Sequence, residues 1–494
     1  MKRTLKSILS RQLSRYRLLL HSSFFMNASA ESLGAGSSSQ SNATTALDHV
    51  ANGNALNSAA PERIRLGICG IGTVGGGTLD VLRRNQQDIN ARSGLQVDIV
   101  HVGARRGLTD HGIEGLRVST DIFAVARDPE VDILVELIGG TTVAYELVKL
   151  ALEQGKHVVT ANKALIAEKG NELFTLADRK GVSIAFESAV AGGIPIIAAL
   201  REGLAANRID WLAGIINGTG NFILTEMRDK GRDFADVLAE AQALGYAEAD
   251  PTFDVEGIDA AHKLVILASI AFGMPLDFNK VFTEGIAAIE PLDVEYAEEL
   301  GFRIKHLGVA KRQADNSVEI RVHPTLIPEE RLIAKVDGVM NAVMVHGDAV
   351  GPTLYYGAGA GAEPTASAVI ADIVRLCRSL RGQARLLPSL GVDSTALSEM
   401  TIVDSSEFVS SYYLRLNAED RPGVLAQVTQ VLSNAGISVR AIIQKKVDVE
   451  HDSLPIIILT NQVQEKSLDQ ALHSIAELES VSDKLIRIRV EDLV

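Results

Sequence analysis

A short apolar segment, Arg63 to Cys69, runs directly into the pattern Gly70-x-Gly72-x-x-Gly75, and a helical pattern follows as far as about Asn90. Glycine at the first position allows a tight turn, and glycine at the second lets the backbone approach a bound group closely. Glycine at the third lets the helix pack against the strand. The helix also begins with unpaired N–H groups, which attract an anion. Strand, loop and helix in this order predict a fold that binds a dinucleotide by its pyrophosphate.

Strand and helix patterns alternate beyond this loop. A helix is expected from about Ala144 to Glu153, with Gly155 as its stop. The alternation predicts an α/β fold with a doubly wound sheet, whose ligands bind at the carboxyl ends of the strands. The expected strands are the apolar runs 97–102, 131–138, 157–160 and 182–186.

Two segments follow expected strands and should reach that edge of the sheet. They are Gly139 to Thr142 and Thr160 to Lys163. Later in the chain, a second glycine-rich loop from Gly357 to Thr365 precedes a helix at 367–376, whose amino terminus is also expected to face the cofactor. The predicted cofactor contacts are Gly70, Gly72, Thr73, Val74, Gly75, Arg105, Thr141, Lys163 and Gly361.

The residues at the end of the second expected strand indicate whether NAD(H) or NADP(H) is preferred. It carries Arg105 and Arg106, where an NAD enzyme often has an acidic residue for the ribose hydroxyl. Arginine suits the 2′-phosphate of NADP(H) instead. We therefore predict that NADP(H) is preferred, with NAD(H) also usable; the alternative is a solvated arginine pair.

Composition narrows the class of protein. The 494 residues are enough for about three domains. The net charge is −14 and the basic residues of the body are scattered, so no nucleic-acid partner is expected. The longest apolar run, Leu264 to Leu276, is too short to span a bilayer, so no membrane partner is expected either. Cys69 and Cys377 lie far apart, which favours a reducing compartment, and we expect the cytoplasm.

Residues 1–61 differ from the rest of the chain. Six basic residues precede the first acidic one, Glu31, and a segment rich in Ser, Asn, Ala and Gly follows. We favour a disordered leader or an upstream extension of the reading frame, with the true start further in, for example at Met26. An organelle transit peptide has the same composition and is the alternative.

The stretch from Ala243 to Lys263 concentrates charged residues just before a strongly apolar helix. Asp259 and Lys263 are four residues apart and share one face of that helix. Glu248 and Asp254 are expected on irregular backbone before it. An exposed Asp/Lys pair would be the ordinary interpretation, but this pair lies in line with residues that should be buried. Charges near a core are costly, so we interpret the stretch as the catalytic centre.

The remaining segments suggest two further domains. The second is α+β, with strands at 209–216, 321–325 and 340–346, a sharp loop from Asn217 to Asn221 and a helix at 235–243. The third has the order βαββαβ, a ferredoxin-like fold. The predicted divisions are a leader at 1–61, a nucleotide domain at 62–190, a catalytic and dimerisation domain at 191–378, a linker at 379–409 and a regulatory domain at 410–494. A return of the last helix of the catalytic domain to the nucleotide domain is the alternative.

From about Arg63 to its end, the chain resembles the homoserine dehydrogenase family, in the monofunctional bacterial form with a C-terminal ACT domain. Thr160 to Lys163 and the loop from Gly357 match the family. Its signature is met by Ala241, Gly245, Asp250, Pro251, Asp254, Gly257, Asp259 and Lys263. The resemblance implies NAD(P)H-dependent reduction of L-aspartate 4-semialdehyde to L-homoserine, on the route to threonine, methionine and isoleucine.

Roles for single residues come with the resemblance. It implies that Lys263 donates a proton to the substrate carbonyl with Asp259 beside it, that Glu248 and Asp254 bind substrate, and that Lys163 lies between cofactor and substrate. A lysine oriented by an aspartate can protonate the alkoxide that hydride transfer leaves.

The resemblance also implies a cation, an effector and an assembly. Some family members bind sodium at a turn that matches Glu187, Val190, Gly192 and Ile194. The turn from Asp420 to Gly423 looks like the ligand loop of ACT domains, which implies feedback by L-threonine and a homo-oligomer. A dimerisation module without ligand is the alternative.

Two other functions compete with this interpretation. A related dehydrogenase that works through a thioester would need a nucleophilic cysteine, and neither Cys69 in a core strand nor Cys377 at a helix end fits that need. A catalytically inactive, nucleotide-binding amino-acid sensor is the other alternative. The presence of Lys163, Glu248, Asp259 and Lys263 argues against it.

Overall fold

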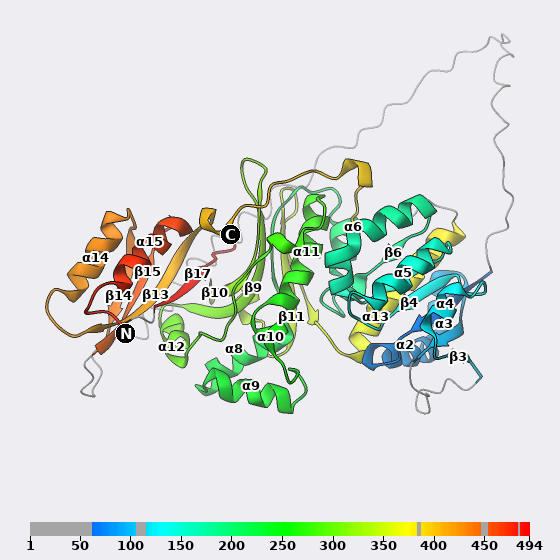
Figure 1. The fold of residues 1–494 in the computed structure, drawn as a ribbon, viewed down its shortest axis with the longest axis horizontal. Coiled ribbons are helices and arrows are strands. Elements are labelled where there is room, and N and C mark those ends of the chain that lie inside the picture. The colour runs from blue at the N-terminus through cyan, green and yellow to red at the C-terminus, as the bar shows by residue number, and fades with distance from the viewer. Residues whose placement is uncertain (1–61, 105–114, 383–386, 446–452, 483–484) are drawn as a thin grey trace, which may run out of the picture. The chain divides into compact units, whose positions relative to one another are not determined.

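The computed structural model describes residues 62–104, 115–382, 387–445, 453–482 and 485–494 (Figure 1). The chain divides into the units Met1–Ser58 and Ala59–Val494, and all the described residues belong to the second. The expectations for the leader 1–61 and for Arg105 and Arg106 therefore lie outside the described residues. Within the described ranges, no helix is long and apolar enough to cross a membrane.

The first sheet has six strands in the order β3-β2-β1-β4-β5-β6, and every neighbouring pair is parallel. This order reverses direction between β1 and β4, so the predicted doubly wound sheet is confirmed. Two strands are shorter than expected. The strands are β1 (Arg63–Cys69), β2 (Gln96–Gly103), β3 (Arg117–Ser119), β4 (Ile133–Glu136), β5 (His157–Thr160) and β6 (Ile184–Ala185).

Helices cover both faces of this sheet, and alternate side chains of β4 pack against the helices on opposite faces. Ile133 and Val135 belong to the core beneath α2, α3 and α13, whereas Leu134 faces α4, α5 and α6. The single helix expected to reach Asn90 is broken at Asn85, which has φ −111° and separates α2 from α3. The helices are α2 (Thr73–Arg84), α3 (Gln86–Ser93), α4 (Ile122–Arg127), α5 (Val143–Glu153), α6 (Lys163–Lys180) and α13 (Ala362–Arg381).

The second sheet has eleven strands. Its main path runs β12-β11-β7-β9-β10-β17-β13-β15-β14, with the short β8 (Phe282–Thr283) beside β10 and β16 (Val463–Gln464) beside β13. The helix α11 (Ile258–Phe272) packs against β9 and β10 (Figure 1). The other strands of the first half are β7 (Ile209–Ile215), β9 (Phe302–Arg312), β10 (Val318–Pro328), β11 (Met340–Gly347) and β12 (Gly351–Ala358).

Among the five longer strands of this half, β9 and β12 were not expected from the sequence. In β9, the polar residues Lys305 and His306 interrupt the apolar alternation, yet both are buried. The Lys305 ammonium donates to the carbonyl of Val336 at 2.6 Å and to Asp337 at 2.9 Å, which compensates its burial. In β12, Gly351 and Pro352 read as loop residues, but the strand lies at the sheet edge, where proline is tolerated.

The expected loop from Asn217 to Asn221 is also wrong, because helix α8 (Gly218–Lys230) begins at its second residue. The Asn217 side chain accepts a hydrogen bond from the Gly220 N–H at 2.7 Å and so caps the helix. Similarly, the glycine-rich loop expected to begin at Gly357 starts later, since β12 continues to Ala358. In both cases a helix or strand extends into residues of low intrinsic propensity because its neighbours in the fold supply the missing partners.

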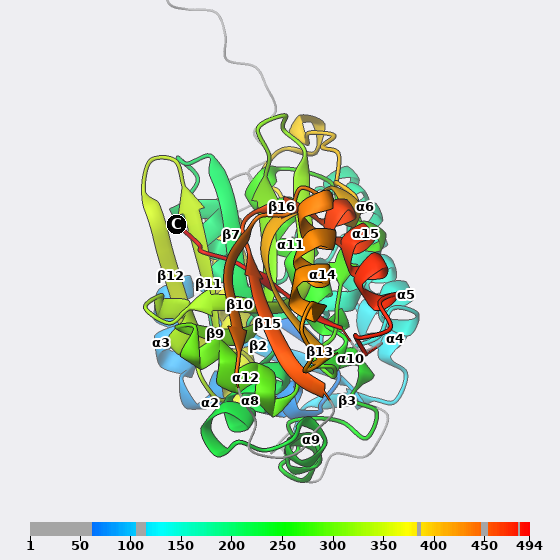
Figure 2. The ribbon, with the colours of Figure 1, turned by 90° about the vertical axis from the view of Figure 1, so that its left-hand side faces the viewer.

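The C-terminal part has the predicted ferredoxin-like order, with the short β16 added. Its strands lie in the order β17-β13-β15-β14, and α14 and α15 cover one face (Figure 2). Strand β17 also pairs with β10 in parallel, Thr325 opposite Arg489, so one sheet continues from the middle of the chain into this part. The elements are β13 (Val409–Glu419), α14 (Val424–Asn434), β14 (Val439–Gln444), β15 (Ser453–Thr460), α15 (Glu465–Ala476) and β17 (Ile486–Val490).

A buried ion pair fixes the other face of this sheet to helix α12 (Pro291–Glu299). The Arg415 guanidinium donates to both oxygens of Asp293, at 2.6 and 3.1 Å, and both side chains are buried. The Tyr413 hydroxyl donates to the same carboxylate at 3.0 Å. The paired donors compensate the loss of hydration that both charges suffer on burial.

We expect Asp293→Ala to destabilise the protein by about 3–5 kcal/mol, because it removes the buried, two-pronged partner of the Arg415 charge and leaves only Glu290, which is 37 % exposed, beside it at 2.9 Å. Calorimetric unfolding should show a lower melting temperature. The matched control is Glu295→Ala on the same helix. Glu295 is 68 % exposed and meets Lys445 at 3.5 Å, so its loss should change stability by less than about 0.5 kcal/mol. Equal melting temperatures for the two variants would contradict this role of Asp293.

Candidate active site

The site begins at the amino terminus of α11. Gly257 lies before the helix with φ +82°, a conformation that favours glycine, and a Cβ there would come within 2.9 Å of Val322 and 3.1 Å of His306. The rest of α11 is buried on almost every side. Asp259 and Lys263 therefore lie one turn apart at the polar end of an otherwise apolar helix.

Four of the predicted site residues meet here. The Lys263 ammonium donates to Asp259 at 2.7 Å and to the backbone carbonyl of Ile216 at 2.8 Å. Lys163 forms an ion pair with the other oxygen of Asp259 at 3.2 Å. The Asn217 amide nitrogen donates to Asp254 and to Asp259, both at 2.8 Å. The cluster therefore places two ammonium groups and one amide around a single buried carboxylate.

Solvent exposure of the charged side chains decreases from Lys163 to Lys263 to Asp259. The Lys163 side chain is 34 % exposed, that of Lys263 12 % and that of Asp259 7 %. Burial alone would raise the pKa of Asp259, but Lys263 and Lys163 together lower it to about 2. Burial lowers the pKa of Lys263 below its usual range, and Asp259 limits that decrease. Burial and the charge of Asp259 raise the pKa of Asp254.

The parallel sheet delivers Lys163 to this cluster. Lys163 is the first residue of α6, directly beyond β5. The side chain of Asn162 caps that helix by accepting from the Leu165 N–H at 3.1 Å. Its amide nitrogen also donates to the Gly140 carbonyl at 2.6 Å, which ties the end of β5 to the loop after β4 that carries Thr141. The carboxyl edge of the sheet and the amino terminus of α11 thus face the same place.

Of the two predicted substrate-binding residues, Asp254 lies in the cluster and Glu248 does not contact it in the described structure. Asp254 lies on the short helix α10 (Thr252–Val255) rather than on irregular backbone. Glu248 is exposed on the loop after α9 (Phe234–Ala243), and its backbone carbonyl accepts from Gln242 at 3.0 Å. Among the residues that the structure describes, the Glu248 carboxylate makes no ion pair or hydrogen bond with the cluster.

The glycines of the first loop behave as the fingerprint requires. Gly70 has φ +97°, and a Cβ on Gly75 would collide with the Gly70 carbonyl oxygen. A Cβ on Gly72 would meet nothing within 4 Å, so open space lies over the start of α2 where a pyrophosphate would bind. Helix α13 brings Gly361 to the same end of the sheet, since the Ala362 carbonyl lies against Gly77 of α2.

The turn of the expected sodium site is strained. Ala191 and Gly192 have φ +54° and +42°. The Glu187 carboxylate accepts from the N–H groups of Ile197 and Ala198 at 2.8 and 2.9 Å, so its oxygens already have donors. Burial and the neighbouring Asp372 raise the pKa of Glu187 to about 7. Within the described ranges, no group of three or more His, Cys, Asp or Glu side chains is arranged to hold a metal ion.

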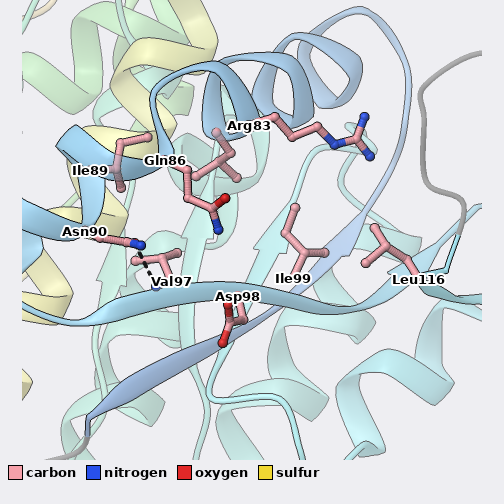
Figure 3. A pocket seen from close by; sticks show the side chains of 9 residues that line it. Arg83, Gln86, Ile89, Asn90, Val97, Asp98, Ile99 and Leu116 are labelled. Carbon is pink, nitrogen blue, oxygen red and sulfur yellow. Dashed lines mark hydrogen bonds between the residues drawn. The ribbon is translucent and has the colours of Figure 1, made fainter.

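A separate cavity of about 300 Å³ lies between α2, α3 and β2 (Figure 3). The cavity is lined by Val97 to Ile99 in the amino-terminal half of β2, and so it lies away from the carboxyl edge of the sheet. None of the predicted site residues in the described part of the chain lines it. We therefore assign the candidate active site to the cluster at α11.

Sequence reasoning missed two members of the cluster. The Ile216 carbonyl carries no side-chain signal, so only the folded chain reveals it. Asn217 was assigned to a loop, although an asparagine directly before Gly-Thr-Gly at the end of a strand is a helix-capping signal. Both cysteines are buried, as expected for Cys69 in its core strand. Cys377, expected at a helix end, lies inside α13, and burial raises its pKa to about 12.

Fold and site together define a dinucleotide-dependent oxidoreductase, with a sheet that binds the cofactor and a lysine–carboxylate pair beside it. Comparison with known protein families identifies which oxidoreductase family the chain matches. Residues 195–374 match the homoserine dehydrogenase family, 70–187 match the homoserine dehydrogenase NAD-binding domain and 412–479 match the ACT domain. The chain belongs to the homoserine dehydrogenase family, and it is an NAD(P)-dependent oxidoreductase.

Known relatives agree along most of the chain. Homoserine dehydrogenase from Pseudomonas aeruginosa is 59 % identical over 431 residues, which cover 87 % of this chain and 99 % of that protein. The crystal structure of a homoserine dehydrogenase from Thiobacillus denitrificans is 55 % identical with a TM-score of 0.83, and covers 88 % of this chain and 100 % of that one. A hyperthermophilic archaeal homoserine dehydrogenase in complex with NADPH is 27 % identical with a TM-score of 0.54, over 64 % of this chain and 97 % of that one.

Replacing Gly72 and Gly75 by alanine should separate binding from folding. Gly72→Ala meets open space, so its melting temperature should match that of the parent while NADPH affinity falls about tenfold or more. Gly75→Ala collides with fixed backbone and should lose stability by about 1–3 kcal/mol as well as affinity. Fluorescence titration with NADPH and calorimetry measure the two effects. Unchanged NADPH affinity in Gly72→Ala would contradict the assignment of this loop.

Proposed function

We propose that the cluster at α11 reduces L-aspartate 4-semialdehyde to L-homoserine, and that Lys263 is the proton donor. The observation that supports this role most directly is the fixed position of the Lys263 ammonium. Of its three N–H donors, two are bound by Asp259 and by the Ile216 carbonyl in the described structure. The third remains for the substrate oxygen.

When bound, the reduced nicotinamide cofactor would supply a hydride to the aldehyde carbon. As negative charge develops on the aldehyde oxygen, the Lys263 ammonium donates a hydrogen bond to it and then transfers the proton, which yields the hydroxyl of the product. Burial lowers the pKa of Lys263, which makes this transfer easier than from a solvated lysine. Asp259 holds the lysine in place and keeps it protonated between turnovers.

We assign the remaining polar groups to substrate binding. Asp254 lies beside Asp259 and accepts the substrate ammonium group, and Glu248 assists from its loop. Lys163 lies at the start of α6, between the sheet edge and Asp259, which suits a position between cofactor and substrate. Its ammonium also lies 5.8 Å from the centre of the Phe253 ring.

For the cofactor we propose a preference for NADP(H), with Arg105 on the 2′-phosphate and the glycine loop, Thr141 and Gly361 around the rest. The open space at Gly72 supports the position of the pyrophosphate. We also propose that sodium binds at the turn 187–194 through backbone carbonyls of Glu187, Val190, Gly192 and Ile194. The consecutive positive φ angles there support a carbonyl-lined site. The C-terminal domain is proposed to bind L-threonine in a homo-oligomer.

Lys263→Ala should lower kcat by about 10²- to 10⁴-fold, because the proton donor is lost, while NADPH still binds. The assay follows NADPH oxidation by the purified protein with L-aspartate 4-semialdehyde. Lys169→Ala, an exposed lysine on α6, is the control and should behave as the parent does. Normal turnover by Lys263→Ala, or no substrate-dependent oxidation by the parent, would refute the proposed function.

The cofactor preference has its own test. Replacing Arg105 and Arg106 by alanine should raise the KM for NADPH about tenfold or more and leave the KM for NADH nearly unchanged, since NADH lacks the 2′-phosphate. Steady-state kinetics with each cofactor measure the ratio. An equal effect on both cofactors would show that the arginines do not read the phosphate.

A further inference from the structure

Asn217 occupies a position that the reaction does not obviously require. It follows β7 and precedes α8, and it is only 5 % exposed. Its carboxamide makes three hydrogen bonds. The oxygen accepts from the Gly220 N–H at 2.7 Å, and the nitrogen donates to Asp254 and to Asp259, both at 2.8 Å.

These three contacts require both halves of the amide. A serine, threonine or aspartate would cap α8 equally well, because each supplies an acceptor oxygen. None of them supplies an NH₂ group with two hydrogens. The cap therefore explains an acceptor at position 217 but does not explain the two bonds to carboxylates.

The two carboxylates have charged neighbours on several elements. Asp259 forms ion pairs with Lys263 on its own helix and with Lys163 on α6. Asp254 has no such pair among the described residues, but it interacts electrostatically with Asp259 and with Lys263. The Asn217 nitrogen is thus a donor that both acids share. Without it, the two acids would face each other with one fewer donor between them, and like charges at close range disfavour ionisation of at least one.

We propose that Asn217 is a positioning residue for the reduction: its NH₂ group holds Asp254 and Asp259 apart, so that Asp259 orients Lys263 while Asp254 is left to bind the substrate ammonium group. This inference rests on the roles proposed above for Asp254, Asp259 and Lys263. It adds a residue that touches neither of the reacting atoms but fixes the two acids that do the binding and the orientation.

The proposal predicts a specific pH effect. The hydrogen bond from Asn217 favours the ionised form of Asp254, so its removal should raise the pKa of that acid beyond the increase caused by burial and by Asp259. Protonated Asp254 cannot pair with an ammonium group. The acid limb of kcat/KM for the aldehyde should therefore move to higher pH, and the loss at neutral pH should appear mainly in KM.

Two variants separate this role from the helix cap. Asn217→Ser keeps a capping oxygen and loses the NH₂ group, whereas Asn217→Ala loses both. We expect both to lower kcat/KM by about ten- to a hundredfold, the size of a lost hydrogen bond to a charged group, with the same shift of the acid limb. Both should lower the melting temperature, because both lose the hydrogen bonds to the two carboxylates, and Asn217→Ala should lower it further because it also loses the helix cap.

A third variant and a control complete the experiment. Asn217→Asp has the same shape and caps the helix, but it adds a third carboxylate, so it should be the least active of the three. Asp404→Ser exchanges another capping residue, which accepts from the Ser406 N–H at 3.0 Å, and should leave kcat/KM and its pH profile unchanged. The assay is NADPH oxidation with L-aspartate 4-semialdehyde by the full-length protein across a range of pH.

The outcomes distinguish the two proposals. If Asn217→Ser has the activity and pH profile of the parent, the asparagine is a helix cap alone and the inference is overturned, even when Lys263→Ala is inactive. If Lys263→Ala keeps normal turnover, the proposed mechanism fails and the inference fails with it. If Asn217→Ser loses activity without a shift of the acid limb, the proposed action through Asp254 is wrong.

Discussion

The ion pair between Lys263 and Asp259 draws its hydrogen-bond and charge partners from several distant segments of the chain. Both groups lie at the start of a helix that is otherwise buried, so each loses hydration and must regain it from neighbours. The neighbours come from distant parts of the chain: Lys163 from α6, Asn217 and the Ile216 carbonyl from the end of β7. The pair is thus stable only when the nucleotide-binding sheet and the second sheet are both in place.

The second sheet serves this site from the other side. Strands β9 and β10 support α11, and His306 of β9 lies against Gly257, where a side chain would not fit. Because β10 also pairs with β17, the sheet that supports α11 continues into the ACT domain. The Arg415 to Asp293 pair attaches that domain to α12 as well. A ligand of the ACT domain would therefore act on a continuous hydrogen-bonded framework rather than through a flexible tether.

Features that depend on local sequence patterns were predicted correctly, whereas features that depend on contacts between distant segments were not. The glycine loop, the parallel strands and the Asp259/Lys263 pair are local patterns, since spacing of 3.6 or two residues and glycine conformation are properties of a short segment. Strand β9 was missed because its buried lysine is compensated by Asp337 and Val336, which are distant in sequence. Asp254 was expected on irregular backbone but lies on a helical turn. Arg105 lies outside the described residues, so its role stays a prediction.

The class of fold, the loop expected to bind dinucleotide and the candidate proton-transfer residues can be predicted from the amino-acid order, because each depends on the spacing of residues within a short segment. Which groups share the Asp259 carboxylate, and how their pKa values change, follows from the tertiary structure alone. Hydrogen bonds and desolvation depend on distances of a few ångströms between segments that the chain brings together from far apart. The bond from Asn217 to two acids is the clearest case, because nothing in the order of residues indicates that one amide lies between them.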